Sequence, residues 1–425
     1  MENGPLKAVI VGGGHRSLTY AELAEIKKDR LQIVGVADPD ENRRNMIAER
    51  FSIPPEHCFY DALALSRAPK FADAVINGTM DHIHVETTIP LLEAGYDVLL
   101  EKPFAVNEDE ARKLADAAKR TGRKVMVCFV LRYADFYRRI KDILLSGEIG
   151  DVIDIHTEEY VSYHHMSTSY VRGKWANSDE CHSTMLLAKC CHDIDIITWL
   201  MGTDRPRLVS SFGSNIQYRQ CNAPEESGTY CVVDCPLVDT CVYSAKRIYL
   251  DHPDRWTVYV WDKLENMENP TLEDKRKLLE TSPYGRCIYK SHNNIVDHQT
   301  VNMIFESGAT GTHSMIGGAP TGTRRISITG TKGMLSGYME EGKITLSVIN
   351  PDPGKEKDDT VIDLTSGDSH GGGDLALVED FVAYCKGEET SVSCTSIEGS
   401  LLSHLVVFLA DKSMENGGAP IEVKA

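Results

Sequence analysis

The feature that most constrains the fold of this chain is an apolar run near its N-terminus that breaks into three consecutive glycines. The run occupies residues 7–11, Gly12 to Gly14 follow, and apolar residues at helical spacing continue from 20 to 26. A strand that turns through glycines into a helix is typical of the first unit of a parallel sheet. Gly12 permits the tight turn, and Gly14 lets the backbone approach a phosphate group at the start of the helix. The sequence therefore predicts an α/β fold that begins with a doubly wound parallel sheet, the Rossmann fold.

An acidic residue at the end of the second expected strand predicts which nucleotide binds there. The strand covers residues 31–37, and Asp38 follows it. A carboxylate at this position accepts hydrogen bonds from the ribose hydroxyls of NAD and repels the 2′-phosphate of NADP. NAD is therefore the expected cofactor, although Arg43 and Arg44 leave NADP open. The third glycine position of the G-x-G-x-x-G pattern is Ser17, which departs from the pattern.

Two further expected strands, at 72–77 and 96–100, end at the same edge of the sheet. The residues that follow them are Thr79, Asp81, His84, Glu101, Lys102 and Pro103. Because ligands of an open parallel sheet bind at the carboxyl ends of its strands, these residues are expected beside the nucleotide. The alternative for Lys102 is an exposed loop lysine.

The order of these motifs resembles the Gfo/Idh/MocA family of nicotinamide-dependent sugar and cyclitol oxidoreductases. The resemblance covers essentially the whole chain, and its most specific part is the Glu-Lys-Pro at 101–103. It implies that Lys102 lies between the nicotinamide and the substrate hydroxyl. The cofactor contacts that it implies are Gly12, Gly14, His15, Arg16, Asp38, Thr79, Asp81, His84, Glu101, Lys102 and Pro103.

The pattern of expected elements changes after residue 127 and predicts two domains. Residues 1–127 are expected to form the NAD-binding Rossmann domain. Residues 128–425 are expected to form an α+β domain with a large, mostly antiparallel open sheet and helices at 374–386 and 396–413. The strands expected in that sheet are 152–161, 208–217, 257–261, 300–305, 325–329 and 344–348.

Residues 185–201 predict an amphipathic helix in the second domain, which ends at Gly202. The helix resembles the substrate-facing helix of the family, whose usual form is D-x-G-x-H-x-x-D. His192 and Asp195 are kept in this chain. The catalytic aspartate position, however, is Ala188, and the glycine position is Cys190.

The absence of that aspartate affects the expected chemistry, in which a hydroxyl proton leaves while the geminal hydride moves to the nicotinamide. His192 is suited to take the proton, because imidazole exchanges protons near neutral pH. Lys189 is expected to reach the same pocket from the same helix face, and Asp193 to pair with it. Two neighbouring ammonium groups, Lys102 and Lys189, disfavour each other's charge, so either is a candidate base.

Polar and aromatic clusters in the second domain are candidates for substrate binding, since a carbohydrate pocket combines both kinds of side chain. Loop or interface positions are the alternative for each of them. The candidates are Arg132, Tyr133, Tyr160, Arg172, Trp175 and His298.

Four of the 12 cysteines crowd into the loop around residues 221–241. The C-x3-C-x5-C spacing at Cys231, Cys235 and Cys241 fits a structural zinc, with Cys221 or Cys287 as the fourth ligand. The resemblance favours Cys287, because relatives in the same subgroup carry the Gly-Arg-Cys that ends at this residue. Reduced cysteines packed as small apolar side chains are the equal alternative, and an iron–sulfur cluster is a remote one.

Composition excludes several classes of partner. The net charge of −18 argues against nucleic acid or an anionic membrane. The first expected strand begins a few residues after Met1, which leaves no room for a signal peptide, and no apolar run reaches the roughly 18 residues of a membrane span. The chain is therefore expected to be cytoplasmic, with reduced cysteines. By resemblance, a homodimer or homotetramer is expected.

Three functions stay open on the sequence alone. The first is NAD-dependent oxidation of a secondary hydroxyl of a sugar, sugar derivative or cyclitol. The second is an NAD-dependent glycosidase that oxidises C3 transiently and eliminates the aglycone, as some members of this fold do. The third is a sugar-sensing regulator that binds NAD without turnover. Intact Lys102 and His192 oppose the third function, as does the lack of a basic patch for DNA.

Overall fold

The computed structural model describes residues 4–252, 257–265, 267, 269–364 and 372–424. Within these residues, the N-terminal part forms a six-stranded sheet in which all strands are parallel. Its strands are β1 (Leu6–Val11), β2 (Leu31–Ala37), β3 (Cys58–Phe59), β4 (Ala74–Asn77), β5 (Asp97–Leu100) and β6 (Val125–Val127). The order β3-β2-β1-β4-β5-β6 reverses direction at β1, which confirms the predicted doubly wound sheet.

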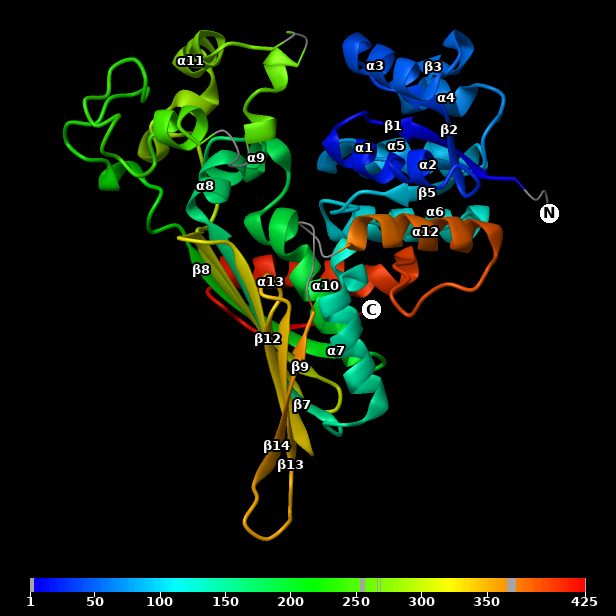
Figure 1. Ribbon diagram of the computed structural model, residues 1–425, viewed down its shortest axis with the longest axis vertical. Helices are drawn as coiled ribbons and strands as arrows, with labels where there is room; N and C mark the ends of the chain where they lie inside the picture. The colour runs from blue at the N-terminus through cyan, green and yellow to red at the C-terminus, as the bar shows by residue number, and fades with distance from the viewer. Residues whose placement is uncertain (1–3, 253–256, 266, 268, 365–371, 425) are drawn as a thin grey trace.

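The described part of the second half forms a nine-stranded sheet in the lower part of Figure 1. Its strands are β7 (Val152–Ser162), β8 (Pro206–Ser214), β9 (His298–Phe305), β10 (Thr310–Ala319), β11 (Thr323–Gly330), β12 (Gly333–Tyr338), β13 (Lys343–Ile349), β14 (Lys357–Asp363) and β15 (Ile421–Glu422). The order is β14-β13-β12-β11-β7-β10-β9-β8-β15. All neighbours are antiparallel except β7 and β10, which run parallel, so the prediction of a mostly antiparallel sheet is confirmed.

Helices cover both faces of the first sheet and one face of the second. They are α1 (His15–Ala21), α2 (Leu23–Ile26), α3 (Glu41–Phe51), α4 (Ala62–Arg67), α5 (His84–Glu93), α6 (Glu108–Thr121), α7 (Asp135–Ser146), α8 (Tyr163–His165), α9 (Ser178–Cys181), α10 (Cys191–Met201), α11 (Leu272–Thr281), α12 (Gly373–Lys386) and α13 (Ile397–Glu415). Three π-helical segments are η4 (Met166–Val171), η5 (Leu186–Cys190) and η7 (Lys246–Leu250). No described helix has both the length and the apolar character to cross a membrane.

Helix α6 shows how local sequence sets the ends of an element. The side chain of Asn107 accepts a hydrogen bond from the backbone of Glu110, which caps the first turn. Three acidic residues begin the helix and two basic residues end it, which complements the helix dipole. Gly122 follows with φ of 66°, a left-handed conformation that glycine adopts without steric cost and that ends the helix.

One predicted strand is wrong, and five strands were missed. Residues 257–261 were expected to form a strand, but they begin with the 3-10 turn Thr257–Tyr259. The missed strands are β3, β10, β12, β14 and β15. The alternating burial of β10 shows one face against helices and one face toward solvent.

Helix α12 returns from the C-terminal part of the chain to the first sheet. Its residues Leu377, Val378 and Phe381 belong to the same buried cluster as Ile10 and Ile33 of that sheet. Figure 1 shows α12 below the parallel sheet, and the helix packs against α1, α2 and β1. The boundary expected at residue 127 lies between the strands of the two sheets. Helix α12, although it comes after this boundary in the sequence, packs on the nucleotide-binding half.

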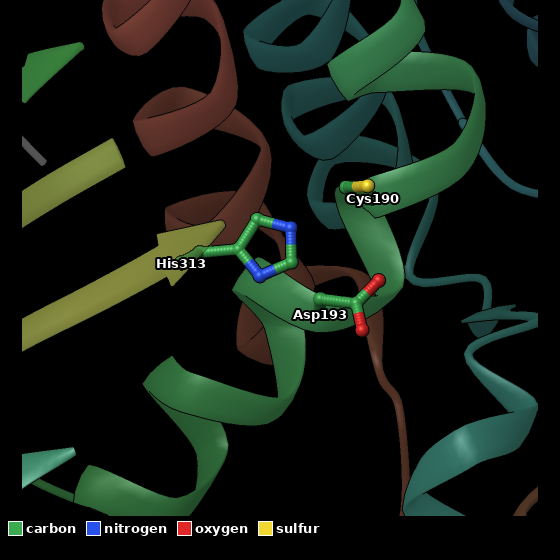
Figure 2. Close-up of side chains that lie close together, drawn as sticks. All are labelled: Cys190, Asp193 and His313. Atoms are coloured by element: carbon green, nitrogen blue, oxygen red, sulfur yellow. The ribbon is translucent and has the colours of Figure 1, made fainter. Parts of the chain in front are cut away.

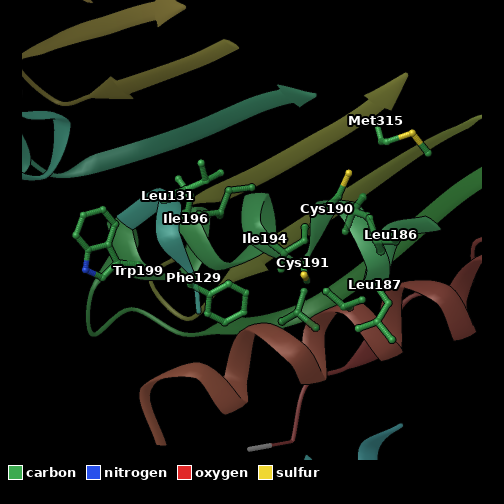
Figure 3. Packing of buried hydrophobic residues seen from close by; sticks show 14 of the residues in the cluster. Phe129, Leu131, Leu186, Leu187, Cys190, Cys191, Ile194, Ile196, Trp199 and Met315 are labelled. Atoms are coloured by element: carbon green, nitrogen blue, oxygen red, sulfur yellow. The ribbon is translucent and has the colours of Figure 1, made fainter. Parts of the chain in front are cut away.

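Helix α10 lies in the centre of the second half, between the nine-stranded sheet and α13 (Figure 3). Every residue from Cys191 to Leu200 is buried. The helix is therefore enclosed on all sides, and the expected amphipathic helix is instead buried around its whole circumference. Its N-terminal extension is not regular, because residues 186–190 form the π-helical segment η5.

Candidate active site

The two halves enclose a cavity of about 510 Å³. The parallel sheet contributes its carboxyl edge and the second half contributes β7, η5, α10 and β11. The lining includes Gly14, Arg16, Thr79, Lys102, Glu159, Tyr160, Trp175, Lys189, His192 and Arg324. Lys102 and His192, which are 90 positions apart in the numbering, therefore face the same space.

The glycine turn fits a bound dinucleotide. Gly12 has φ of 76°, and a Cβ on it would lie 2.8 Å from the backbone nitrogen of Thr79, so a side chain is excluded there. A Cβ on Gly14 would meet no atom within 4 Å, which leaves room beside the turn for a pyrophosphate. Ser17, at the third glycine position, donates from its hydroxyl to the carbonyl of Gly12 at 2.6 Å and stabilises the turn.

Asp38 supports the same turn from the end of β2. Its Oδ2 accepts a hydrogen bond from the backbone of Gly13 at 2.6 Å, and its Oδ1 accepts one from Asp40 at 2.8 Å. Arg43 and Arg44, which left NADP possible as the cofactor, both have partners within the protein. Arg43 pairs with Glu265 at 3.2 Å, and Arg44 donates to the carbonyl oxygen of Asp38 at 2.6 Å.

Glu101 organises the strand end that carries Lys102. It accepts hydrogen bonds from Tyr20 at 2.6 Å and Arg16 at 3.1 Å, and its second oxygen accepts the backbone N–H of Lys102 at 2.7 Å. Burial acts to raise the pKa of Glu101, but Arg16 and Lys102 outweigh it and the pKa is lowered. Arg16 also pairs with Asp374 at the start of α12, so this part of the nucleotide site depends on the returning helix.

Asp81 and His84 line the cavity and connect neighbouring segments. His84 lies between two carbonyl groups, at 2.7 Å from that of Pro103 and 2.9 Å from that of Thr79. Asp81 accepts hydrogen bonds at 2.9 Å from Trp175 Nε1 and from the Ser183 hydroxyl, both in the second half. Both side chains therefore position parts of the site, and Asp81 ties the two halves together.

Lys102 contacts Ala188, which occupies the position of the family's usual catalytic aspartate. Its Nζ donates a hydrogen bond to the backbone carbonyl of Ala188 at 2.8 Å. Ala188 lies within η5, and π-helical segments leave carbonyl groups out of the regular α-helical pattern. The backbone therefore supplies a neutral acceptor in place of the missing carboxylate.

Four charged side chains form a buried network, and three of them, Glu159, Lys189 and Arg324, line the cavity. Lys189 Nζ lies 3.1 Å from Glu159 Oε1, and Arg324 Nε lies 2.7 Å from Glu159 Oε2 and 3.0 Å from Asp193 Oδ1. The predicted pair between Lys189 and Asp193 is wrong. The π-helical turn before Cys191 changes the spacing on which that pair depended, so each residue finds a partner on the sheet instead.

Sequence reasoning missed several residues that line the cavity, namely Glu159, His164, His165, Tyr170, Arg324 and Glu340. Burial and the nearby Lys189 ammonium lower the pKa of His165 well below its usual range, so its imidazole is neutral. A signal for His164, His165 and Tyr170 was available, because they lie between Tyr160 and Trp175, two residues that were singled out. Both of those residues line the cavity.

Four predicted substrate contacts lie away from the cavity lining. Arg132 forms a buried bidentate pair with Asp195, at 2.7 and 2.6 Å. The hydroxyl of Tyr133 donates to Asp380 at 2.8 Å. The remaining two are Arg172, which donates to the carbonyls of Arg286 and Tyr243, and His298, which lies 2.7 Å from Asp297. These side chains are occupied by structural contacts.

The predicted zinc site of Cys231, Cys235, Cys241 and Cys287 is not confirmed. Among the residues that the structure describes, no three of these thiols come close enough to share an ion. The guanidinium of Arg172 lies beside them and donates to Cys231 Sγ at 3.7 Å. A positive charge in contact with the thiol disfavours a second cation there, so the arrangement does not fit zinc.

A parallel nucleotide-binding sheet joined to an open antiparallel sheet, with lysine and histidine side chains in the cavity between them, defines a two-domain nicotinamide-dependent oxidoreductase. The chain belongs to the Gfo/Idh/MocA oxidoreductase family. Residues 6–129 match the family's NAD-binding Rossmann fold, and residues 141–423 match its C-terminal alpha/beta domain. The resemblance expected from the sequence is therefore confirmed.

Several relatives of the chain are named as dehydrogenases or oxidoreductases. The putative oxidoreductase YteT of Bacillus subtilis is 26% identical over 380 residues, which cover 86% of this chain and 85% of YteT. An inositol 2-dehydrogenase of Salmonella typhimurium is 25% identical, covering 47% of this chain and 55% of the relative. A trans-1,2-dihydrobenzene-1,2-diol dehydrogenase of Xenopus laevis is 28% identical, covering 43% and 52%. The chain thus spans about half the length of the last two.

Solved structures share the fold over the full length. Levoglucosan dehydrogenase in complex with NADH matches with a TM-score of 0.72 and 16% identity, covering 99% of both chains. An oxidoreductase from Agrobacterium radiobacter in complex with NAD+, L-tartaric acid and magnesium matches with a TM-score of 0.67 and 18% identity, covering 98% of both chains. At these identities the similarity shows the fold alone.

The position of Asp38 leads to a prediction on cofactor choice. Asp38→Ala removes the charge that would meet a 2′-phosphate and a group able to bind the ribose hydroxyls. We expect NAD affinity to fall by about 10-fold to 100-fold, the range for hydrogen bonds to a charged group, while the ratio of NAD to NADP affinity falls as well. Binding titrations with NAD and with NADP give the two dissociation constants. Their ratio is informative because a looser glycine turn would weaken the binding of both cofactors. Glu41→Gln, an exposed carboxylate nearby, is the control, and equal wild-type affinity for the two cofactors would contradict the prediction.

Asp411 of α13 leads to a prediction on pH. Its carboxyl group accepts hydrogen bonds from Thr184, just before η5, at 2.5 Å and from Gln299 at 3.0 Å, and burial raises its pKa to about 6. A carboxyl group with a raised pKa binds its proton more tightly in the folded state. The free energy of unfolding therefore falls as the pH rises from about 4 to about 6 and levels off above that.

Asp411→Asn removes this dependence. The free energy of unfolding is compared between the variant and the wild type at each pH. The value for the variant minus the value for the wild type should be about 1–3 kcal/mol larger at pH about 7.5 than at pH about 4. Denaturant titrations at several pH values measure the difference. A difference that stays constant with pH would show that Asp411 titrates normally.

Proposed function

We propose that the protein oxidises a secondary hydroxyl of a sugar, sugar derivative or cyclitol, with NAD as the hydride acceptor. The observation that carries the proposal is the single cavity that Lys102 and His192 line together beside the glycine turn. Family membership supports a redox reaction. A relative named inositol 2-dehydrogenase supports a polyhydroxylated substrate.

The lining of the cavity suits such a substrate. Tyr160, Tyr170 and Trp175 offer aromatic faces for the apolar C–H faces of a sugar ring, while Glu159 and Arg324 offer charged groups for its hydroxyls. A substrate with both kinds of surface would contact both sets of residues.

Roles for the two central residues follow from their positions. Bound NAD supplies the hydride acceptor. Lys102, held by the carbonyl of Ala188, would donate a hydrogen bond to the substrate oxygen and stabilise negative charge on it. His192 would take the hydroxyl proton. Lys189 is paired with Glu159, so we assign it to orientation of the substrate, although its ammonium also lines the cavity.

The alternative is an NAD-dependent glycosidase that oxidises C3 transiently and then eliminates the aglycone. The specific observation in its favour is the surplus of proton-transfer groups in the cavity. Besides Lys102 and His192, the cavity is lined by Tyr160, His165 and Lys189. An elimination needs a second base for the C2 proton and an acid for the leaving group, and these side chains could supply both.

We also propose a homodimer or homotetramer that pairs through the uncovered face of the nine-stranded sheet. Large apolar side chains are exposed at alternate positions on that face, including Phe212, Ile304 and Met334. Exposed apolar surface of this kind is typical of protein interfaces. The expected cytoplasmic location stays a prediction.

The experiment that tests the function is a substrate panel. Purified protein is incubated with sugars, sugar acids, cyclitols and nitrophenyl glycosides, with and without NAD, while NADH and nitrophenol are followed by absorbance. Accumulation of NADH with a free sugar or cyclitol is the expected result. Nitrophenol release that requires NAD without net NADH would establish the glycosidase instead. NAD binding without turnover on the whole panel would favour a regulator.

Two variants test the assigned residues on the substrate that the panel identifies. Lys102→Ala and His192→Ala should each reduce turnover by about 100-fold to 10,000-fold, the usual worth of a positioned proton-transfer group. NAD affinity and the melting temperature should stay nearly unchanged. Lys113→Ala and His292→Ala, which change exposed residues of the same types, are the matched controls. Wild-type turnover in either active-site variant would refute the assignment.

A further inference from the structure

A second polar cluster lies on the side of α10 that faces the nine-stranded sheet. It consists of Cys190, Asp193 and His313, all buried. The Sγ atom, a carboxylate oxygen and an imidazole nitrogen lie within 4.8 Å of one another, and the described ranges of the chain contain no other such group of three. Figure 2 shows the three side chains close together, with Cys190 and Asp193 on helical turns and His313 on a strand, β10.

Two ligand atoms in this cluster are buried and have no hydrogen-bond partner among the described residues. His313 Nε2 and Asp193 Oδ2 are both of this kind, on side chains that are 0% and 2% exposed as residues. A buried polar atom without a partner costs free energy, and such atoms are rare in folded proteins. Two such atoms on side chains of one cluster, together with a cysteine sulfur, make the cluster a candidate site for a bound ion.

The other polar atom of each of these two side chains, His313 Nδ1 and Asp193 Oδ1, has a hydrogen-bond partner. His313 Nδ1 lies 2.9 Å from the hydroxyl of Thr157, and Asp193 Oδ1 accepts a hydrogen bond from Arg324 at 3.0 Å. When Nδ1 donates to Thr157, the lone pair of Nε2 faces the cluster. A second hydrogen bond of this kind fixes the tautomer and orientation of metal-binding histidines in general.

We propose that Cys190, Asp193 and His313 bind one divalent cation, and that the ion the ligands fit best is Zn²⁺. Thiolate, imidazole and carboxylate groups are the usual ligands of zinc, whereas Mg²⁺ and Ca²⁺ prefer oxygen ligands alone. Binding forms a sulfur–metal bond and releases the Cys190 thiol proton to solvent. The three protein ligands leave one tetrahedral position for water.

The charges around the cluster are compatible with this ion. The Cys190 thiolate and the Asp193 carboxylate together carry two negative charges. Arg324 contacts Asp193 at 3.0 Å, but unlike Arg172 beside Cys231 it also pairs with a second carboxylate, Glu159, at 2.7 Å, so its charge is shared between two acidic groups. Figure 3 shows Cys190 on the sheet side of the helix near Met315, so the ion would lie among buried side chains, where electrostatic attraction is stronger than in bulk water.

The position of the cluster gives the ion a function. Cys190 ends η5 and Asp193 lies in the first turn of α10, so the two ligands bracket His192. An ion bound to both and to β10 would hold this turn against the sheet. It would thereby fix the orientation of Lys189 and His192 toward the cavity on the other side.

Metal analysis of the purified full-length protein tests the proposal. Protein prepared without chelators should contain about one equivalent of zinc, as a preformed three-ligand site predicts. Cys190→Ala and His313→Gln should each lose the metal. Cys231→Ala is the matched control, because it removes a cysteine from the loop that first drew attention to zinc, and it should keep the metal.

Cobalt gives a readout that does not depend on the folding of the variants. Chelated wild-type protein titrated with Co²⁺ should show the d–d absorption of a tetrahedral ion and a thiolate-to-cobalt charge-transfer band, and Zn²⁺ should abolish both. Its melting temperature should rise by several degrees with Zn²⁺. Wild-type protein that contains no metal and shows neither band would overturn the proposal. Metal that Cys190→Ala retains and Cys231→Ala loses would also overturn it, since the ion would then belong to the cysteine loop.

Discussion

The complete burial of α10 is the constraint on which the site depends. A helix with no exposed face cannot leave its polar side chains to water, so each needs a partner inside the protein. Asp195 pairs with Arg132 at the junction of the two halves, and Asp193 pairs with Arg324 on the sheet. His192 lines the cavity. The same helix therefore serves both folding and the active site. Asp195 holds the junction of the two halves, Asp193 holds the helix against the sheet, and His192 belongs to the cavity.

The alanine at position 188 changes the electrostatics of the cavity more than its shape. A carboxylate there would neutralise Lys102, whereas the carbonyl of Ala188 accepts a hydrogen bond from Lys102 without adding charge. Four carboxylates still line the cavity, namely Asp81, Glu101, Glu159 and Glu340, and Glu159 on β7 is already shared by Lys189 and Arg324. The cavity is richer in positive charge than it would be with aspartate at position 188, which favours substrates or transition states with negative oxygen atoms.

The nucleotide-binding edge could be predicted from sequence because glycine turns and strand ends depend on residues close together in the chain. Glu159 and Arg324 could not, because they meet only where β11 pairs with β7 and places them directly opposite each other. The π-helical turn at 186–190 was also missed, because the apolar periodicity of the sequence predicted a regular helix over 185–201 and does not distinguish the two. Residues 257–261 misled the prediction because their β-branched and aromatic composition is typical of a strand.

The return of α12 to the parallel sheet bears on the order in which the chain folds during synthesis. The first 127 residues cannot complete their hydrophobic layer alone, because Leu377 and Phe381 of α12 form part of it. The ion pair between Arg16 and Asp374 is equally distant in sequence. A ribosome would have to release almost the entire chain before the nucleotide-binding half closes. Until then, apolar surface on that half stays exposed, which is the kind of surface that chaperones protect from aggregation. Contacts between residues so far apart in sequence also form slowly.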